Sequence, residues 1–335
     1  MKESLIIGGG AWGTAIANLV AENSNKKTFI WTLEENVKRD INRSLVNKSF
    51  LPKIKLNKNI EATNNFIKPN SLDIVYIVVP SQYVHDVLKK FVIEREKYNL
   101  EINPIYVICS KGIDLKRKKF LSDIIYQITS SKKIAILSGP TFAVQLAKKM
   151  PSAVTLACKS KKQSEYIIKR LSNSYFRLYT TNDILGVQIN GILKNVLAIA
   201  AGITEGLGLG ENARAALITR GIKEIFIIMK CVGGKKNTVL GLSGLGDILL
   251  TCNSRHSRNY SFGFYLGKGK KLKNILSGNK QVTEGLENIK FIYFIKTKFK
   301  VDTPIFDSIY KILIQQVNIK KIVKELLKRP QKKEY

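Results

Sequence analysis

Three glycines near the start of the chain have the spacing of a phosphate-binding loop. Gly8, Gly10 and Gly13 form G-x-G-x-x-G between a short apolar run, Ser4 to Ile7, and a helical pattern, Thr14 to Glu22. Glycines at such a junction permit a tight turn and let main-chain amides reach a pyrophosphate held at the positive end of the helix. The position between strand and helix favours dinucleotide binding over a simple glycine-rich turn.

An acidic residue lies where nucleotide selectivity is set. Glu34 follows the second apolar run, Thr28 to Thr32, and lies about 20 residues beyond Gly13. A carboxylate there accepts hydrogen bonds from ribose hydroxyls and repels a 2′-phosphate, so the sequence favours NAD, with NADP possible. Alternatively, Glu34 only opens the next helix, and Lys38 or Arg39 could still reach a phosphate.

Two cationic side chains further along the chain suggest chemistry of a different kind. Lys194 lies inside an otherwise apolar helical pattern, where an unpaired ammonium would be unfavourable, and this favours a functional role. Arg258 offers a planar fork that matches two phosphate oxygens, and the Asn259 amide stands beside it. Asp247 could orient a lysine or bind a hydroxyl group, or it could cap a helix from Ile248 to Cys252.

The elements that must position these residues follow from the apolar periodicity. Up to Asp183, β-branched runs are mostly followed by helical patterns or Gly/Pro turns, which predicts a mostly parallel sheet with helices on both faces. We therefore expect a Rossmann-like dinucleotide-binding domain over residues 1–183. Its predicted strands are Ser4 to Ile7, Thr28 to Thr32, Asp73 to Val79, Ile105 to Cys109, Ile134 to Leu137, Ala153 to Cys158 and Phe176 to Tyr179.

The pattern changes to long helices after Asp183. We expect an all-helical domain over residues 184–335 that binds substrate and carries the catalytic residues, giving an α/β protein with a helical C-terminal domain. The predicted helices are Ile184 to Glu205, Asn212 to Cys231, Glu284 to Phe299, Pro304 to Gln316 and Ile319 to Leu327.

Composition limits the possible partners. The 335 residues, 44% of them hydrophobic and 24% charged, suffice for about two globular domains. Lys and Arg number 56 against 25 Asp and Glu, so at a formal charge of +31 a nucleic acid or an anionic membrane surface has to be weighed. The lysine runs are separated in sequence, which favours a solvated surface and no specific nucleic acid. These runs are Lys116 to Lys119, Lys268 to Lys273 and Lys320 to Lys333.

Histidine and cysteine usage excludes further classes. With only His85 and His256, the chain cannot build a His-rich metal centre or a multi-histidine relay, and no metal is expected. Charged residues such as Lys194 and Lys230 interrupt the apolar stretches, which we expect to fall short of the ~20 residues of a membrane span. The cysteines form no Cys-x-x-Cys pair and predict the reduced core of a cytoplasmic protein. They are Cys109, Cys158, Cys231 and Cys252.

Nine short motifs in sequence order resemble the NAD(P)-dependent glycerol-3-phosphate dehydrogenase family from Leu5 to about Leu313. The motifs are Gly8 to Ala15, Val79 to Ser81, Ser110 to Ile113, Ser138 to Ala143, Asn190 to Val196, Asn212 to Gly221, Gly244 to Asp247, Ser257 to Asn259 and Val282 to Gly285. The resemblance implies reversible reduction of dihydroxyacetone phosphate to sn-glycerol 3-phosphate with NAD(P)H, which feeds glycerophospholipid synthesis.

The resemblance also implies roles for individual residues. Lys194 matches the general acid and base, and Lys111 and Asp247 match further catalytic positions. Substrate contacts are implied for Lys111, Gly139, Thr141, Asn195, Asp247, Thr251, Ser257, Arg258 and Asn259. With the glycine loop and Glu34 included, the cofactor neighbours are Gly8, Gly10, Ala11, Trp12, Gly13, Glu34, Lys111, Ala143, Arg258, Val282 and Glu284.

The residue chemistry agrees with these roles. Ketone reduction requires a proton for the developing alkoxide, and a buried lysine beside a second cation, such as Lys111, can donate it near neutral pH. The chain departs from the family pattern at Gln188 and Asn190, where a more acidic approach to the lysine is expected. It also lacks the basic residue after Trp31 that is associated with NADP preference.

Other interpretations remain open from sequence. A β-hydroxyacid or 6-phosphogluconate type of dehydrogenase has a similar glycine-rich fold, helical second domain and catalytic lysine. A basic protein that binds nucleic acid or a membrane surface is a third, non-enzymatic alternative. The expected partner is a small-molecule substrate, and a homodimer is possible.

Overall fold

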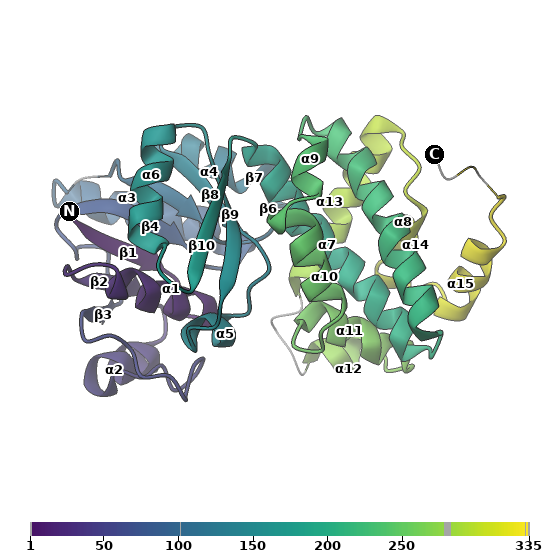
Figure 1. Ribbon diagram of the computed structural model, residues 1–335, viewed down its shortest axis with the longest axis horizontal. Helices are drawn as coiled ribbons and strands as arrows, with labels where there is room; N and C mark the ends of the chain where they lie inside the picture. The colour runs from purple at the N-terminus through teal and green to yellow at the C-terminus, as the bar shows by residue number, and fades with distance from the viewer. Residues whose placement is uncertain (1, 101, 278–282, 332, 334–335) are drawn as a thin grey trace. The chain divides into compact units, whose positions relative to one another are not determined.

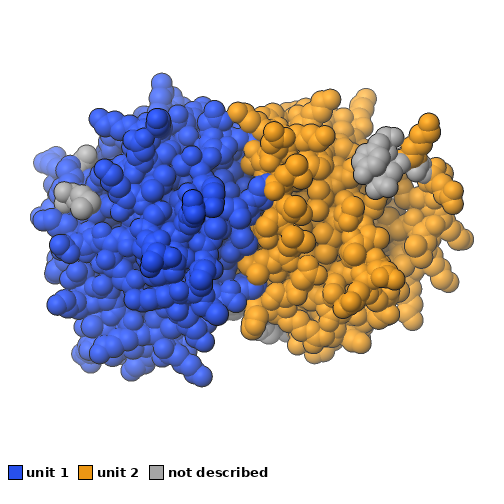
Figure 2. All heavy atoms as spheres, in the orientation of Figure 1, with its two compact units in different colours: residues 1–188, 241–243 blue, residues 189–240, 244–335 orange. Residues whose placement is uncertain are grey.

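The computed structural model describes residues 2–100, 102–277, 283–331 and 333, without the side chains of 276, 277, 283, 284 and 287. Val282 and the side chain of Glu284, two predicted cofactor neighbours, therefore lie outside the described residues. The chain divides into two compact units, coloured separately in Figure 2: residues 1–188 with 241–243, and residues 189–240 with 244–335.

Within the described part of the chain, eight strands of the first unit form one sheet in the order β10-β9-β8-β5-β4-β1-β2-β3 (Figure 1). All neighbours are parallel except β8 and β9, which are antiparallel. The mostly parallel sheet and the seven predicted strands are confirmed. The strands are β1 (Glu3–Ile7), β2 (Thr28–Trp31), β3 (Ile60–Thr63), β4 (Leu72–Ile77), β5 (Ile105–Ile108), β8 (Ile134–Ser138), β9 (Ser152–Cys158) and β10 (Phe176–Thr181).

Helices connect these strands and bury both faces of the sheet. Alternation along β1 sends Ile6 into a core shared with α1, while Leu5 and Ile7 enter a second core shared with α3 and α4. The helices are α1 (Ala11–Glu22), α2 (Glu35–Ser44), α3 (Val84–Lys97), α4 (Leu121–Thr129), α5 (Ala143–Ala147) and α6 (Lys161–Leu171). The 3-10 turn η1 (Ser81–Tyr83) and the short hairpin β6 (Ile113–Asp114) and β7 (Lys119–Phe120) complete the unit.

The strand order reverses at β1, which pairs with β2 on one side and with β4 on the other. In open α/β sheets, ligands bind at such a switch point, beyond the carboxyl ends of the strands. The loop that carries Gly8 and Gly10 leaves β1 at this position, so the fold places the predicted phosphate-binding loop where a dinucleotide binds.

The second unit is helical and contains no strand in its described residues. The predicted helices are confirmed, except that α14 ends at Leu313 rather than Gln316, which has a left-handed φ of 54°. The helices are α7 (Ile184–Gly206), α8 (Gly210–Cys231), α9 (Lys236–Val239), α10 (Asp247–Cys252), α11 (Arg258–Gly267), α12 (Leu272–Ser277), α13 (Thr283–Phe299), α14 (Pro304–Leu313) and α15 (Ile319–Leu327). A π-helical turn, η2 (Leu242–Gly246), precedes α10.

Helix α7 corrects one expectation. It is 23 residues long and apolar enough to span a membrane by length and composition, although the sequence predicts no stretch of that kind. Within the described residues it is the only such helix, and 89% of its most apolar window is buried in the protein. Lys194 interrupts the apolar sequence but does not end the helix. Because most of the helix is buried in the protein, α7 is a core helix.

Glycines allow α7 and α11 to cross with their backbones in close approach. A Cβ at Gly263 would lie 2.1 Å from the carbonyl oxygen of Ile199, and a Cβ at Gly267 would lie 2.5 Å from that of Ile203. A Cβ at Gly202 on α7 would likewise lie 2.0 Å from the carbonyl oxygen of Tyr260. The two helices are therefore parallel here, in a fixed register.

We expect Gly263→Ala to destabilise the protein by about 1–3 kcal/mol, because the new methyl group forces the two backbones apart. Thermal and denaturant unfolding would measure this loss. Tyr265→Ala is a matched control, since Tyr265 is 42% exposed on the same helix. A Gly263→Ala protein with unaltered stability would show that the crossing tolerates separation.

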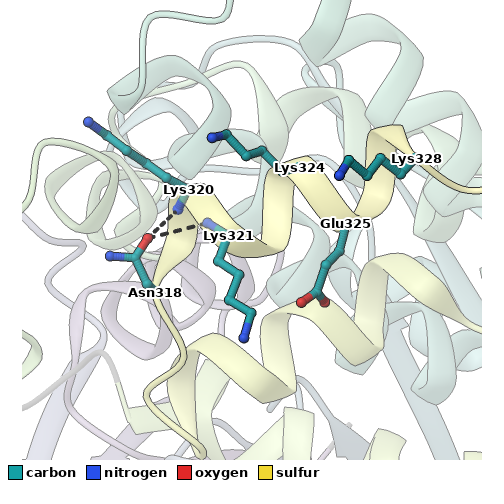
Figure 3. A pocket seen from close by; sticks show the side chains of 6 residues that line it. All are labelled: Asn318, Lys320, Lys321, Lys324, Glu325 and Lys328. Atoms are coloured by element: carbon teal, nitrogen blue, oxygen red, sulfur yellow. Dashed lines mark hydrogen bonds between the residues drawn. The ribbon is translucent and has the colours of Figure 1, made fainter.

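The surface of α15 carries the lysines of one predicted run. Lys320, Lys321, Lys324 and Lys328 are exposed and line a hollow together with Asn318 and Glu325 (Figure 3). Asn318 caps the helix by accepting hydrogen bonds from the amides of Lys320 and Lys321. Exposed lysines along more than two turns of an amphipathic surface helix are typical of a solvated face.

Candidate functional site

A buried ion pair joins α7 and α10 in the helical unit. The Nζ atom of Lys194, in the middle of α7, lies 2.6 Å from Oδ1 of Asp247 and 3.0 Å from the hydroxyl oxygen of Thr251. Lys194 is only 6% exposed and Asp247 only 1%. The carboxylate and the hydroxyl offset the loss of water around the ammonium, which explains how a lysine is kept inside an apolar helix.

Helix α10 presents both partners of Lys194. Asp247 and Thr251 are four residues apart and therefore share one helix face. The alternative role of Asp247 as a helix cap is wrong, because Gly246 holds the N-cap position and the carboxylate accepts the lysine's hydrogen bond. Gly244 lets the preceding turn close, since a Cβ there would lie 2.1 Å from the Val239 carbonyl oxygen.

The first turn of α11 presents the predicted phosphate ligands. Ser257 is the N-cap, and its hydroxyl accepts a hydrogen bond from the Tyr260 amide at 3.3 Å. Arg258 is exposed and Asn259 half-buried. The positive end of a ten-residue helix and the Arg258 guanidinium together provide a cationic, donor-rich surface that suits a phosphate.

Helix packing sets this turn relative to Lys194. The contacts between α7 and α11 pair Gly202 with Tyr260 and Ile199 with Gly263, so the first turn of α11 lies beside the part of α7 that follows Lys194. Helix α13 packs on the same region: the side chain of Asn288 donates to the carbonyl oxygen of Ile192 at 3.4 Å.

Two further residues lie close to the contact of α7, α11 and α13. Asn195 follows Lys194 and is 5% exposed. Gly285 on α13 leaves room for Asn259, because a Cβ there would lie 2.7 Å from Oδ1 of Asn259. In the helical unit, Lys194 therefore contacts Asp247 and Thr251, while Asn195 lies on α7 and Ser257, Arg258 and Asn259 lie at the start of α11.

The glycine loop of the first unit has the geometry that a pyrophosphate requires. Gly8 has a φ of +128°, and a Cβ at Gly13 would lie 1.9 Å from the Gly8 carbonyl oxygen. At Gly10, the N-cap of α1, a Cβ would meet no atom within 4 Å, and no side chain caps the helix. The half-buried Ala11 and Trp12 open that helix. This open, uncapped helix end fits a dinucleotide phosphate.

Sequence reasoning missed the residue that braces this loop. The buried side-chain amide of Asn47 donates to the Gly9 carbonyl oxygen and to the Thr14 hydroxyl oxygen, both at 2.8 Å. Asn47 follows α2 and is 38 residues from Gly9. No local pattern indicates such a contact.

Glu34 lies just beyond the carboxyl end of β2. Its exposed carboxylate accepts a hydrogen bond from the Thr32 hydroxyl at 2.6 Å, and α2 begins at the next residue, Glu35. Glu34 holds the N-cap position of α2 without a side-chain capping bond. The carboxylate is therefore not used in capping the helix.

Three other predicted residues meet in the first unit. The Lys111 ammonium lies 3.5 Å from the Gly139 carbonyl oxygen, and the Thr141 hydroxyl donates to the same oxygen at 3.4 Å. Ala143, the first residue of α5, follows them. Lys111 and Lys194 belong to different units, so the predicted role of Lys111 beside Lys194 stays a prediction.

The two departures from the family pattern have local partners. Gln188 accepts a hydrogen bond from the Ser122 amide at 3.1 Å and donates to the Ser122 hydroxyl at 3.0 Å. Asn190 donates to the Thr238 carbonyl oxygen at 3.0 Å. Both side chains thus anchor the first part of α7.

Comparison with protein families decides between the dehydrogenase alternatives. Residues 5–164 match the N-terminal model of NAD-dependent glycerol-3-phosphate dehydrogenase, and residues 183–324 match the C-terminal model of the same enzyme. The chain belongs to the NAD-dependent glycerol-3-phosphate dehydrogenase family. The predicted family, enzyme class and use of NAD or NADP are thereby confirmed.

Relatives in this family cover the whole chain. A glycerol-3-phosphate dehydrogenase [NAD(P)+] of Solidesulfovibrio magneticus is 40% identical over 98% of this chain and 99% of its own length. One of Bacillus subtilis is 37% identical over 98% and 95%. The crystal structure of glycerol-3-phosphate dehydrogenase from Coxiella burnetii superposes with a TM-score of 0.89 at 33% identity, covering 98% of this chain and 99% of that one.

Cys252 follows Thr251 in α10 and lies close enough to Lys194 and Asp247 for their charges to act on its thiol. His85 pairs with the adjacent Asp86 at 2.7 Å, and His256 is exposed. Cys109, Cys158 and Cys252 are buried free thiols, and Cys231 is half-buried. Burial raises the pKa of the Cys252 thiol to about 12, so it stays protonated at neutral pH.

Proposed function

We propose that this chain reduces dihydroxyacetone phosphate to sn-glycerol 3-phosphate with NAD(P)H, and that Lys194 carries the proton transfer. The buried contact of Lys194 with Asp247 and Thr251 is the observation that supports this most strongly. A reactive amine held by a carboxylate and a hydroxyl in a water-poor site is an arrangement suited to general acid–base catalysis.

The proton moves between Lys194 and the substrate oxygen. As the carbonyl carbon is reduced, its oxygen gains negative charge, and Nζ of Lys194 donates a proton to it. In the reverse direction the neutral amine accepts the hydroxyl proton of glycerol 3-phosphate. Asp247 and Thr251 fix the position of Nζ in both directions, so little reorganisation accompanies the transfer.

The phosphate of the substrate binds at the first turn of α11. Arg258 donates two parallel hydrogen bonds to phosphate oxygens, and the Asn259 side chain and the positive end of the helix add to the binding. The parallel register of α7 and α11 supports one substrate molecule reaching both Arg258 and Lys194. We also assign Asn195, Thr251 and Ser257 to this substrate site.

The first unit supplies the nucleotide site. The loop at Gly8, Gly10 and Gly13 would hold the pyrophosphate of NAD(P)H, which supplies a hydride when bound. We assign Ala11, Trp12, Lys111 and Ala143 to its surroundings, and Lys111, Gly139 and Thr141 to the substrate. In this proposal, residues 1–183 bind the dinucleotide and add these three substrate contacts, whereas residues 184–335 carry the other substrate contacts and the catalytic Lys194.

Glu34 is proposed to select NADH over NADPH. We expect Glu34→Gln to lower the NADH-to-NADPH ratio of kcat/KM about tenfold, as removing a carboxylate–phosphate repulsion of about 1.4 kcal/mol would do. Initial rates with both nucleotides measure this ratio. Glu35→Gln, which removes an exposed carboxylate 2.8 Å from Lys38, is the control. An identical ratio in wild type and Glu34→Gln would exclude Glu34 as the selector.

We also propose a cellular compartment and an assembly state for the protein. Four free cysteines support a reducing compartment such as the cytoplasm. A homodimer stays a prediction that sedimentation velocity can test.

The direct test of the function is a substrate comparison. NADH oxidation by the purified protein should require dihydroxyacetone phosphate, and β-hydroxyacids or 6-phosphogluconate should give no reaction with NAD. Turnover of either acid in preference to glycerol 3-phosphate would overturn the proposal.

A further inference from the structure

We propose that Glu205 is a positioning residue for the segment Ser257 to Asn259. The proposal rests on the proposed function, in which this segment binds the phosphate of dihydroxyacetone phosphate. Glu205 lies 11 residues after Lys194 on α7, which corresponds to ~16 Å along the helix. It therefore acts through other residues rather than on the reacting atoms.

The Glu205 carboxylate holds the segment from both sides. Its Oε1 atom accepts hydrogen bonds from Nε and Nη2 of Arg255 at 3.2 and 2.5 Å. Its Oε2 atom accepts a hydrogen bond from the Tyr260 hydroxyl and one from Nη1 of Arg214 at 3.4 Å. Arg255 comes two residues before the segment and Tyr260 directly after it, so a single carboxylate on α7 fixes both flanks.

Arg255 is tied to α11 as well as to α7. Its carbonyl oxygen accepts a hydrogen bond from the Ser261 hydroxyl at 2.7 Å, and its guanidinium lies 4.1 Å from the centre of the Phe264 ring. The turn that leads into Ser257 is thus folded back on the first turns of α11. Without Glu205, the contacts with Ser261 and Phe264 of α11 would be the remaining ones that hold Arg255 among the described residues, and the turn could shift together with that helix end.

The charge and exposure of Glu205 and Arg255 indicate that their ion pair positions the segment Ser257 to Asn259 and adds little to the stability of the fold. Burial alone would raise the pKa of Glu205, but the hydrogen bonds from Tyr260 and Arg255 and the charges of Arg255 and Arg214 together outweigh this effect. The net pKa of Glu205 is lowered, so its carboxylate stays ionised at neutral pH. The Arg255 side chain is 64% exposed, and an exposed ion pair adds little stability. Losing the pair should therefore displace the phosphate ligands without unfolding the protein.

The test measures substrate and nucleotide constants separately. We expect Glu205→Gln to raise the KM for dihydroxyacetone phosphate about tenfold, with kcat and the KM for NADH changing less than about threefold. The inhibition constant of inorganic phosphate against this substrate should rise in parallel. Arg255→Ala, at an exposed site where folding is not at risk, should shift the same two constants in the same direction.

The control is Arg329→Ala, which removes an Arg–Asp pair of 2.7 Å between Arg329 and Asp302 elsewhere in the helical unit. It should leave every constant unchanged. Wild-type constants for dihydroxyacetone phosphate and inorganic phosphate in both Glu205→Gln and Arg255→Ala would overturn the proposal. Equal changes in the NADH and substrate constants would overturn it too, as they indicate a general structural defect. If the wild-type protein does not reduce dihydroxyacetone phosphate, the proposed function itself fails.

Discussion

Lys194→Ala should lower kcat by a factor of ~10²–10⁴ and leave the affinity for NADH nearly unchanged, because proton transfer by a positioned side chain contributes about that much. The lost amine is the group that donates to the developing alkoxide. Steady-state rates give kcat, and titration of the quenched protein fluorescence gives the dissociation constant of NADH. Lys230→Ala, at an exposed lysine in the last turn of α8, is the control.

Removing Lys194 also leaves the Asp247 carboxylate buried without its cation, which destabilises proteins by about 3–5 kcal/mol. The double variant Lys194→Met, Asp247→Asn restores neutrality. It should fold with stability closer to that of wild type while remaining as inactive as Lys194→Ala. Near-normal turnover in either variant would show that Lys194 is not the general acid.

Arg258→Ala should raise the KM for dihydroxyacetone phosphate about 10- to 150-fold, as expected from losing a charge-assisted hydrogen bond of about 1.5–3 kcal/mol. Its effect on kcat should be small, because the phosphate group does not react. Steady-state kinetics with dihydroxyacetone phosphate measure both constants.

Two comparisons isolate the phosphate contact of Arg258. Arg258→Lys keeps the charge but loses the planar fork, so its KM should lie between those of wild type and Arg258→Ala. Unphosphorylated dihydroxyacetone should react equally slowly with all three proteins. An unchanged KM for the phosphorylated ketone in Arg258→Ala would remove Arg258 from the phosphate site.

The sequence predicts those site residues whose chemistry is unusual for their surroundings. Lys194 stands out because an ammonium in an apolar helix requires a partner, and the structure supplies one. That partner could not be identified from the local pattern, because Asp247 lies 53 residues away and also suits a helix cap. The glycine loop is predicted for a similar reason, since three glycines between strand and helix have few other uses.

Residues that act at long range carry no comparable signal. Asn47 braces the glycine loop from 38 residues away, and Glu205 fixes Arg255 across 50 residues. An isolated asparagine or glutamate gives no indication of such a partner. Strand β3 (Ile60–Thr63) is missed because it has four residues and follows a polar, lysine- and asparagine-rich stretch.

A crystal structure of the protein with dihydroxyacetone phosphate and NAD+ tests the central claim most directly. We expect Nζ of Lys194 within about 2.6–3.2 Å of the carbonyl oxygen of the bound ketone. The Arg258 guanidinium should contact the phosphate of the same molecule. A substrate that contacts only one of these two side chains, with the other out of its reach, would contradict this account.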